Sequence, residues 1–507
     1  MSVPNHPQYD EMLPLLVKVE DCAKGADHIK GKTTDYLPPT RSMIQDGYYG
    51  SAQNLQCEDG TFRNKGVVDY ASYVDRAVFP TYVSDAIENY LGLLHKKPPV
   101  VKAKGKVLEL LPKLTNFGEN VNEFLLRIND QQLRSGRAGI LVDVNTKTNK
   151  PYLALYAGKA ITNWNDNDGD SPYKKLNFVA LDESGPVFVK ETFSWIPHAK
   201  KVRVLSLNDA GNFVVAVGDS VLTATDFTEI TCQGKPHSGI AFYFANCTTN
   251  SPDMENPPLL KIANTCLSIY RSEADYRRAL HLQGQDTLVL KGMRATGEED
   301  EAIRTGAGAA IIVESEGDAK YIGLSSSGIA EQRIALEKDH EQASLASGQF
   351  VGTNKGNNES GDAMKTRIAS RTASLLTIAV VGASALQDAL RSCGKLLGLS
   401  QTEIDEITVV PNLDFVKGAF SAQELIQLVT SRNAGAPISL NTLHKYLVDY
   451  GVTDETLDNE LALIAKEKPG DIKPIIEQID KSTGSGVGGS KPVEIPKEAK
   501  TDVDSRP

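Results

Sequence analysis

The chain has few cysteines, and they show none of the spacings that build metal sites or disulfide frameworks. Six are scattered over 507 residues without a CxxC pair. Because regular, short spacing marks zinc sites and disulfide-rich domains, this scatter predicts reduced, structural thiols. The eight histidines show no HExxH or HxH spacing, so the usual zinc-hydrolase motif is excluded. The cysteines are Cys22, Cys57, Cys232, Cys247, Cys266 and Cys393.

Long hydrophobic runs and a leader-like start are also missing. The first residues, MSVPNHPQYDEMLP, contain neither a basic n-region nor an apolar stretch, so they do not predict a signal peptide. The longest apolar run, residues 375–386, is shorter than the roughly 20 residues that a membrane helix needs. We therefore expect no membrane association, and we expect this run to be a buried stretch of helix.

Positive charge is in the minority. Fifty-four Lys and Arg residues against 65 Asp and Glu residues give a formal net charge of −11. A protein that binds nucleic acid over a whole face by releasing counterions needs a basic surface, and this balance argues against that class. A negative charge instead suits a protein with a channel, because a weakly repulsive channel wall lets a polyanion slide past it. The length suggests about three domains, and 40% hydrophobic residues are enough for substantial cores.

No catalytic or nucleotide-binding motif is complete. Residues 25–33 (GADHIKGKT) resemble a P-loop, but five residues separate the glycines and a helical pattern precedes them. Residues 306–311 (GAGAAI) lack the third glycine of a dinucleotide-binding turn. Residues 163–170 are rich in Asn and Asp but have no acidic residue at the twelfth position of a calcium loop. We therefore expect no cofactor, no metal and no enzymatic activity; the alternative is a hydrolase whose site is assembled from distant acids and histidines.

The first half of the chain predicts helices followed by strands. Apolar residues recur at helical spacing over residues 9–35, 67–95 and 121–135. The second run stops at Lys96-Lys97-Pro98-Pro99, and the third stops at Gly136. Two apolar runs separated by a polar turn, residues 139–144 and 151–156, predict a β-hairpin. Further strand-like runs cover residues 177–181, 187–195, 201–207 and 213–217.

The second half predicts long helices around a small insert. Residues 259–283 and 326–349 read as two helices of similar length, each longer than the usual globular helix. Between them, β-like runs at residues 287–292 and 309–315 flank the acidic stretch GEEDEAIRTG. The arrangement is a long helix, a compact insert and a second long helix.

After a polar loop at residues 352–361, the longest helical pattern covers residues 362–397 and contains Gly382, a candidate bend point. A strand-like run at residues 407–412 precedes a helical region that extends to about residue 479. The tail from Lys481 is rich in Gly, Ser, Pro and charge, and predicts disorder.

This order of elements, together with local sequence, resembles the portal proteins of tailed bacteriophages. NPPLLKIANTCLSIYRSEADYRRALHLQGQDTLVLKG, residues 256–292, is similar to the segment that runs from the first stem helix into the clip in one portal family. ESGDAMKTRIASRTASLLTIA, residues 359–379, is similar to the segment after the tunnel loop. SGRAGILVDV, PYLALY with ITNW, and HPQYDEMLP are similar too. The resemblance covers roughly residues 5–470.

The resemblance implies an α+β fold with portal architecture: a wing, a two-helix stem, a small α/β clip, a tunnel loop with a long helix, and a helical crown. The parts are then expected at residues 1–256 (N-terminal wing), 257–284 (first stem helix), 285–325 (clip), 326–350 (second stem helix), 351–361 (tunnel loop), 362–420 (long helix and wing return), 421–480 (crown) and 481–507 (disordered tail).

The resemblance also implies a dodecameric ring at one capsid vertex of the virion, assembled in the host cytoplasm, through which double-stranded DNA passes non-specifically during packaging, retention and ejection. Its implied partners are the terminase packaging motor, a head-tail adaptor or connector, and the major capsid protein or scaffold. The alternative of the same class is another phage ring protein, from a connector or a baseplate.

Three groups of residues are expected to carry this function. In the tunnel loop, short polar side chains and one lysine per subunit would contact phosphates weakly and reversibly. The loop residues nearest DNA are expected to be Asn354, Lys355, Asn357 and Asn358. Further channel or inter-subunit contacts are expected from Lys365, Arg367 and Arg371. The acidic docking surface of the clip is expected at Glu298, Glu299, Asp300 and Glu301.

Overall fold

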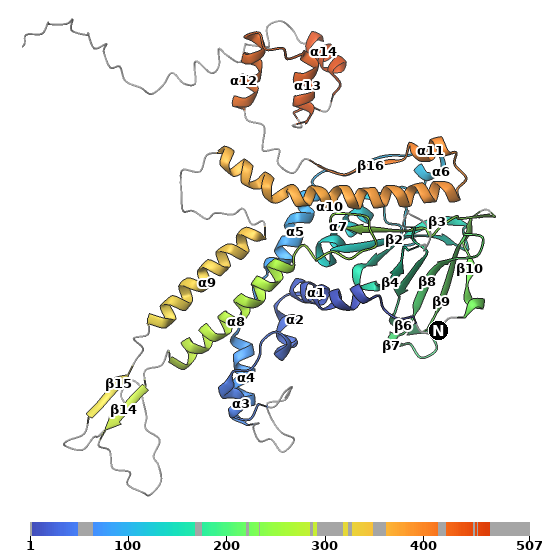
Figure 1. The fold of residues 1–507 in the computed structure, drawn as a ribbon. Coiled ribbons are helices and arrows are strands. Elements are labelled where there is room, and N and C mark those ends of the chain that lie inside the picture. Colours follow the sequence, from blue (N-terminus) through green and yellow to red (C-terminus); the bar gives the residue numbers. More distant parts are fainter. Residues whose placement is uncertain are drawn as a thin grey trace, which may run out of the picture. The chain divides into compact units, whose positions relative to one another are not determined.

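The chain contains α-helices and several small antiparallel sheets, which confirms the predicted α+β class (Figure 1). The structure is a computed structural model, and it divides into two units, residues 1–416 and 417–507. It describes residues 3–48, 64–167, 175–219, 223–232, 234–283, 287–291, 318–322, 327–347, 361–413, 422–449, 452–453 and 455–466.

The helical runs predicted near the N-terminus are each interrupted. The first divides at Gly25, whose φ of +91° is a conformation that favours glycine. The second divides before Pro80, which has no backbone N–H to continue a helix. The resulting elements are α1 (Pro7–Lys24), α2 (Ala26–Gly31), η1 (Thr33–Asp35), α3 (Arg41–Gln45), α4 (Lys65–Arg76) and α5 (Tyr82–Leu94).

Helix α7 (Val121–Ser135) and the hairpin after it lie where the sequence predicts them. A capping box between Asn120 and Glu123 starts α7, and Gly136 in the left-handed conformation ends it. Strand β2 (Arg137–Asn145) then pairs antiparallel with β3 (Lys150–Ala157). The sequence did not predict β13 (Phe242–Asn246), which pairs with the other edge of β2 and completes the order β13-β2-β3.

A five-stranded sheet with the order β10-β9-β8-β5-β4 holds three of the predicted strands, β5, β8 and β9. The single strand predicted over residues 187–195 is wrong. The chain reverses there, with Phe193 at a φ of +51°, and forms the hairpin of β6 and β7. The strands are β4 (Ile161–Asn165), β5 (Phe178–Asp182), β6 (Gly185–Val189), β7 (Ser194–Ala199), β8 (Val202–Leu207), β9 (Phe213–Gly218) and β10 (Thr228–Glu229).

The long helices of the second half also lie where they are predicted. They are α8 (Leu260–Gln283), α9 (Ser327–Ala346) and α10 (Gly361–Leu396). Between α8 and α9, strand β14 (Thr287–Lys291) pairs antiparallel with β15 (Asp318–Ile322). The β-like run predicted at residues 309–315 lies outside the described residues.

Shorter elements complete the first unit, among them the pair of β1 and β16, which contains the strand predicted near residue 407. They are β1 (Val100–Lys102), α6 (Gly105–Leu108), η2 (Gly158–Ala160), η3 (Ala224–Asp226), β11 (Thr231–Cys232), β12 (Lys235–Pro236), α11 (Gln401–Asp405) and β16 (Thr408–Val410).

The second unit contains three helices in the region predicted to be helical. They are α12 (Ala422–Asn433), α13 (Leu440–Asp449) and α14 (Leu457–Lys466). The side chains described in these helices are all exposed or half-buried. The tail predicted to be disordered lies outside the described residues.

Helix α10 connects the two cores of the first unit. Its residues Leu375, Ile378 and Ala379 pack in a helical core formed largely by α1, α4, α5 and α8. From Ala383 onward, α10 packs in a second core with α7 and the strands. Residues 373–396 are long and apolar enough to cross a membrane by length and composition, but half of the most apolar window is buried in the protein. The prediction of a buried helical stretch is thus confirmed, and α10 serves as a core helix.

Gly382 lies within α10 where two side chains of α7 come close. A Cβ atom at this position would lie 2.8 Å from both Asn129 Nδ2 and Gln132 Oε1. These two atoms are hydrogen-bonded to each other, and Gln132 Nε2 also donates to Asn246 O and Ile378 O. Because Gly382 has no side chain, α7 lies close enough to α10 for Gln132 to donate a hydrogen bond to the backbone of α10 at Ile378.

We expect Gly382→Ala to lower the free energy of unfolding by about 1–3 kcal/mol, because overpacking displaces this buried amide network. Gly92→Ala is the matched control: Gly92 is also helical, but a Cβ there meets no atom within 4 Å. Its gain in helix propensity should stabilise the protein by about 0.5 kcal/mol. Urea unfolding of both variants measures the difference, and equal stabilisation by the two alanines would contradict the close packing.

Candidate functional site: helices α8, α9 and α10

One face of α8 is fixed to the N-terminal helices by polar contacts. Arg271 Nε donates to Tyr36 O at 2.9 Å, and Tyr73 donates its hydroxyl to Asp275 at 2.6 Å. Arg278 Nη1 donates to the Thr40 hydroxyl at 2.6 Å. Positions 271, 275 and 278 are spaced four and three residues apart, so they share one face of the helix. Apolar side chains of α8 reinforce this attachment; those that are fully or nearly buried include Ile262, Ala263, Cys266, Leu267 and Tyr270.

Helix α9 returns along a different face of α8 (Figure 1). Ile269 of α8 forms a small apolar cluster with Leu336 and Ala343 of α9. His340 lies beside this cluster, 2.9 Å from the Tyr82 hydroxyl and 3.6 Å from a carboxylate oxygen of Glu273. Helix α8 is therefore held on two faces at once, by the body of the protein and by α9.

The contact surface of α9 is narrow. Leu336, Ala343 and Ser347, spaced seven and four residues apart, are the buried positions described between residues 328 and 347. The rest of the helix is exposed or half-buried and carries four acidic and two basic side chains. These are Glu331, Glu337, Asp339, Glu341, Arg333 and Lys338. Most of this 20-residue helix is thus accessible to solvent, as expected of a helix that packs through a single stripe.

The residues expected to meet DNA and partners are only partly placed by the structure. The tunnel-loop residues Asn354, Lys355, Asn357 and Asn358 lie outside the described residues, as do the clip residues Glu298, Glu299, Asp300 and Glu301. Lys365, Arg367 and Arg371 belong to α10, but the surroundings of their side chains are likewise outside the description. All three groups stay predictions.

Comparison with known proteins singles out the same part of the chain. Residues 258–395 match a family model described as Domain of unknown function (DUF4055). This segment spans α8, the β14–β15 insert, α9 and nearly all of α10. No curated protein matches the chain by sequence.

Solved structures of particle components are distantly similar. One is a chain from the neck of an empty GTA particle computed with C6 symmetry, with 14% identity and a TM-score of 0.40, covering 73% of this chain and 90% of that one. A second is a chain from the virion of a native gene transfer agent particle, with 14% identity and a TM-score of 0.40, covering 81% and 98%.

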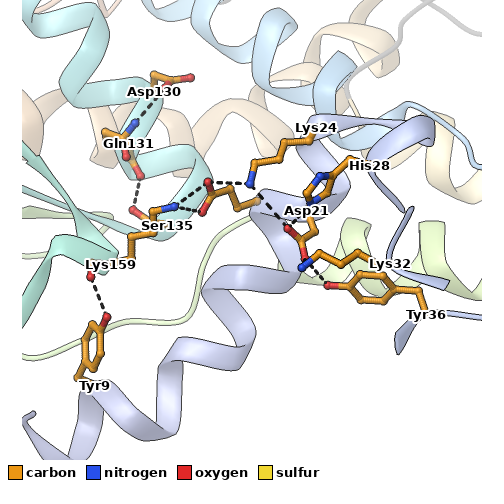
Figure 2. A network of polar contacts seen from close by, with 11 residues as sticks. Tyr9, Asp21, Lys24, His28, Lys32, Tyr36, Asp130, Gln131, Ser135 and Lys159 are labelled. Atoms are coloured by element: carbon orange, nitrogen blue, oxygen red, sulfur yellow. Dashed lines mark hydrogen bonds and ion pairs between the residues drawn. The ribbon is translucent and has the colours of Figure 1, made fainter. Parts of the chain in front are cut away.

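The stretch that resembles a P-loop, residues 25–33, has a different role. Two of its side chains, His28 and Lys32, lie around the buried carboxylate of Asp21 on α1 (Figure 2). His28 Nε2 lies 2.7 Å from Asp21 Oδ1, the Tyr36 hydroxyl donates to Oδ2 at 2.8 Å, and Lys32 lies 3.9 Å away. Burial opposes ionisation, but the hydrogen bonds from His28 and Tyr36 outweigh it and lower the pKa of Asp21. These contacts therefore hold α2 against α1.

A second polar contact fastens α1 to the β-rich part of the unit. Lys159 Nζ donates to both carboxylate oxygens of Glu20, at 2.8 and 2.7 Å, and Tyr9 donates its hydroxyl to Lys159 O at 2.8 Å (Figure 2). The small cavity between these elements, about 290 Å³, is lined by Lys24, Arg134 and Lys159 together with Glu20. Because Glu20 bonds both lysines, this cavity is partly neutralised and is a weak candidate for an anion site.

No sequence pattern predicts the stack that contains Arg137. The guanidinium is fully buried, with its central carbon 4.0 Å from the centre of the Trp164 ring and 4.5 Å from that of Phe244. His6 stacks on Trp164 at a centroid distance of 4.1 Å, and Arg137 Nη2 donates to Pro252 O. Burial lowers the pKa of Arg137 to about 9. These residues lie far apart in the sequence, so only the fold brings them together.

No group of three or more His, Cys, Asp or Glu side chains arranged for a metal ion occurs in the described part of the chain. The five described cysteines are free and buried, in agreement with the structural thiols that were predicted; Cys57 lies outside the description. Burial raises the pKa of Cys22, Cys247 and Cys266 to about 12, which keeps these thiols protonated and unreactive.

Proposed function

We propose that this chain is a phage portal protein, which forms a ring-shaped channel at one capsid vertex for packaging, retaining and ejecting double-stranded DNA. The observation that carries the proposal is the pair of helices α8 and α9 around the β14–β15 insert. Helix α8 is bonded to the body on one face and to α9 on another, while α9 leaves most of its own surface open. Neighbouring copies in a ring would cover such a surface.

The other parts take their roles from the order of the elements. The insert would be the clip, with Glu298 to Glu301 offered to the packaging motor and later to the tail connector. The loop before α10 would face the channel, where Lys355 of each subunit contacts phosphate. Helices α12 to α14 would form the crown. The net charge of −11 supports this function, because weak repulsion lets DNA slide along the channel wall.

Helix α10 would support this assembly mechanically. It runs for 36 residues, from the expected tunnel loop through the helical core to the β-rich core. If DNA displaced the loop, the movement would therefore be transmitted to both cores through α10. Gln132, which bonds the backbone of α10 at Ile378, is one of the contacts that would resist the displacement.

Electron microscopy of the purified full-length chain tests the proposal. We expect ring-shaped particles of twelve subunits in views along the axis, and light scattering should give the matching mass. A chain that stays monomeric at high concentration and at every salt concentration contradicts the proposal.

The channel role of the loop needs a separate experiment. Replacing residues 352–361 by a Gly-Ser segment of the same length should leave the rings intact and reduce the amount of DNA that is packaged or retained. Normal packaging would exclude the loop from this role. A connector or baseplate ring is the alternative, and the position of the ring in assembled particles separates it from a portal.

A further inference from the structure

The segment that precedes α1 lies along the edge of the five-stranded sheet. The backbone N–H of His6 donates to Thr162 O at 2.9 Å, and the Asn163 side chain donates from Nδ2 to Pro4 O at 2.7 Å. Both partners belong to β4, which is the last strand on its side of the sheet. Residues 3–6, called the strap here, therefore cover part of the open edge of β4.

The strap also reaches over one face of the same sheet. Val3 is half-buried and packs against a small apolar patch formed by one side chain from each of β5, β8 and β9. The patch consists of Ala180, Val204 and Ala216. Four residues with so few contacts are weakly attached, and such segments open locally while the rest of a protein stays folded.

His6 joins the strap to α1. It is the N-cap residue of this helix, and its ring atom Nδ1 accepts the backbone N–H of Gln8 at 3.2 Å. A ring nitrogen can accept only while it carries no hydrogen, so the bond requires the neutral imidazole. The ring also stacks on Trp164 of β4, with the centroids 4.1 Å apart and the planes inclined by 19°. One neutral side chain thus contacts both the helix and the strand.

A positive charge on His6 would disrupt this arrangement for three reasons. Protonated Nδ1 can no longer accept the N–H of Gln8, so α1 would lose its cap. The cation would lie at the N-terminus of an 18-residue helix, where the helix dipole repels positive charge. It would also lie close to a second cation, because the Arg137 guanidinium is 4.0 Å from the centre of the same Trp164 ring.

Acidic side chains nearby act in the opposite direction but do not prevail. Burial and the charge of Arg137 lower the pKa of His6, while the carboxylates of Asp253 and Asp166 favour its protonated form. Asp10, in the first turn of α1, is bonded by the side chain of Asn5 in the strap. Because the pKa is lowered, the closed strap binds fewer protons than the open one. Its stability is complete above the ordinary pKa of 6.5 and is lost as the pH falls through the lowered value.

We propose that the strap is a pH-sensitive latch, which protonation of His6 releases from β4. Release uncovers the edge of β4, the ring of Trp164 and the apolar patch under Val3. The opening stays local, because Tyr9 in the first turn of α1 still donates its hydroxyl to Lys159 O at 2.8 Å. The inference goes beyond the proposed portal function and does not depend on it.

The exposure of Trp164 reports the state of the latch. The chain contains two tryptophans, so Trp195→Phe leaves Trp164, which is 4% exposed, as the single fluorophore. In this full-length background we expect the acrylamide quenching constant to rise several-fold when the pH is lowered from about 7.5 to about 5. His6→Asn retains a good N-cap acceptor that does not titrate in this range, and its quenching constant should not change with pH.

Hydrogen exchange of the strap separates the charge from the loss of the ring. At about pH 5 the amides of the strap should exchange on the order of 10-fold faster in the wild type than in His6→Asn. Comparison at one pH cancels the intrinsic pH dependence of exchange. His6→Lys carries a permanent charge, so at about pH 7.5 its strap should exchange faster than that of His6→Asn. His198→Asn is the matched control at an exposed histidine, and it should retain the wild-type response.

Three results would each overturn the proposal. An equal pH response in the wild type and His6→Asn would assign the response to another group. A strap in His6→Lys that is as protected as in His6→Asn would show that the cap tolerates a cation. Acid that accelerates exchange in the buried strand β2 as much as in the strap would indicate general unfolding, whereas release of the latch leaves β2 protected.

Discussion

Arg137→Ala is expected to lower the free energy of unfolding by about 3–5 kcal/mol, the range for truncating a large buried side chain. Three contributions add up. The substitution leaves a cavity between the rings of Trp164 and Phe244, it removes cation–π contacts at 4.0 and 4.5 Å, and it leaves Pro252 O without its donor. Urea unfolding followed by the fluorescence of Trp164 measures the loss.

Burying the positive charge of Arg137 costs free energy, and this cost offsets part of the stabilisation from these contacts. Its Nε and Nη1 atoms have no hydrogen-bond partner within the described part of the chain. Arg137→Met keeps most of the volume and removes the buried charge, so it should be less destabilising than alanine. Arg137→Lys keeps a charge but loses the plane that stacks between the rings, and it should be no better than alanine.

Arg127→Ala is the matched control. Arg127 is half-exposed and bonds Glu119 at 2.7 Å, and such surface pairs contribute about 0–1 kcal/mol. If Arg137→Ala unfolds at the same urea concentration as Arg127→Ala, the stack has no role in stability.

Ala343→Asp is expected to detach α9 from α8 and to prevent ring formation. Ala343 is 1% exposed and packs against Ile269 and Leu336. A carboxylate there would be buried in an apolar cluster, at a cost of about 3 kcal/mol or more. Outside this stripe, α9 is attached by polar contacts, in which the Tyr82 hydroxyl lies 2.9 Å from His340 and Tyr90 donates its hydroxyl to Ala346 O at 2.7 Å. Amide hydrogen exchange in α9 should therefore accelerate by on the order of 100-fold.

Ala335→Asp makes the same change on the exposed face of the same helix. In the monomer it should leave the exchange of α9 unchanged, because the new carboxylate stays in water. The rest of the protein should remain folded in both variants, since α8 keeps its bonds to Tyr36, Tyr73 and Thr40. Protected α9 amides in Ala343→Asp would show that the stripe does not hold the helix.

Local signals explain which elements could be predicted. Helix α7 has a capping box at Asn120 and a glycine at position 136, and both act within one turn of the helix. The long helices α8, α9 and α10 have sustained helical spacing and clear breaks between them. By contrast, β13 is a short apolar run, and its pairing with β2, about a hundred residues earlier, has no local mark.

The reversal at Phe193 also escaped prediction, for a related reason. Turns with positive φ usually contain glycine, asparagine or aspartate, and the stretch KETF offers none of them. Its hydrophobic flanks therefore read as one strand, although they form two.

The sequence by itself determined the α+β class, the acidic and cysteine-poor character, and the order of two long helices, a small insert and a third long helix. These follow from composition and from spacing within single elements. Only the tertiary structure decided that the Arg137 guanidinium lies over the rings of Trp164 and Phe244, that Gly382 makes room for Gln132, and that α9 buries only one narrow stripe. Each of these depends on residues distant in sequence meeting in space, and no local pattern encodes which partners will meet.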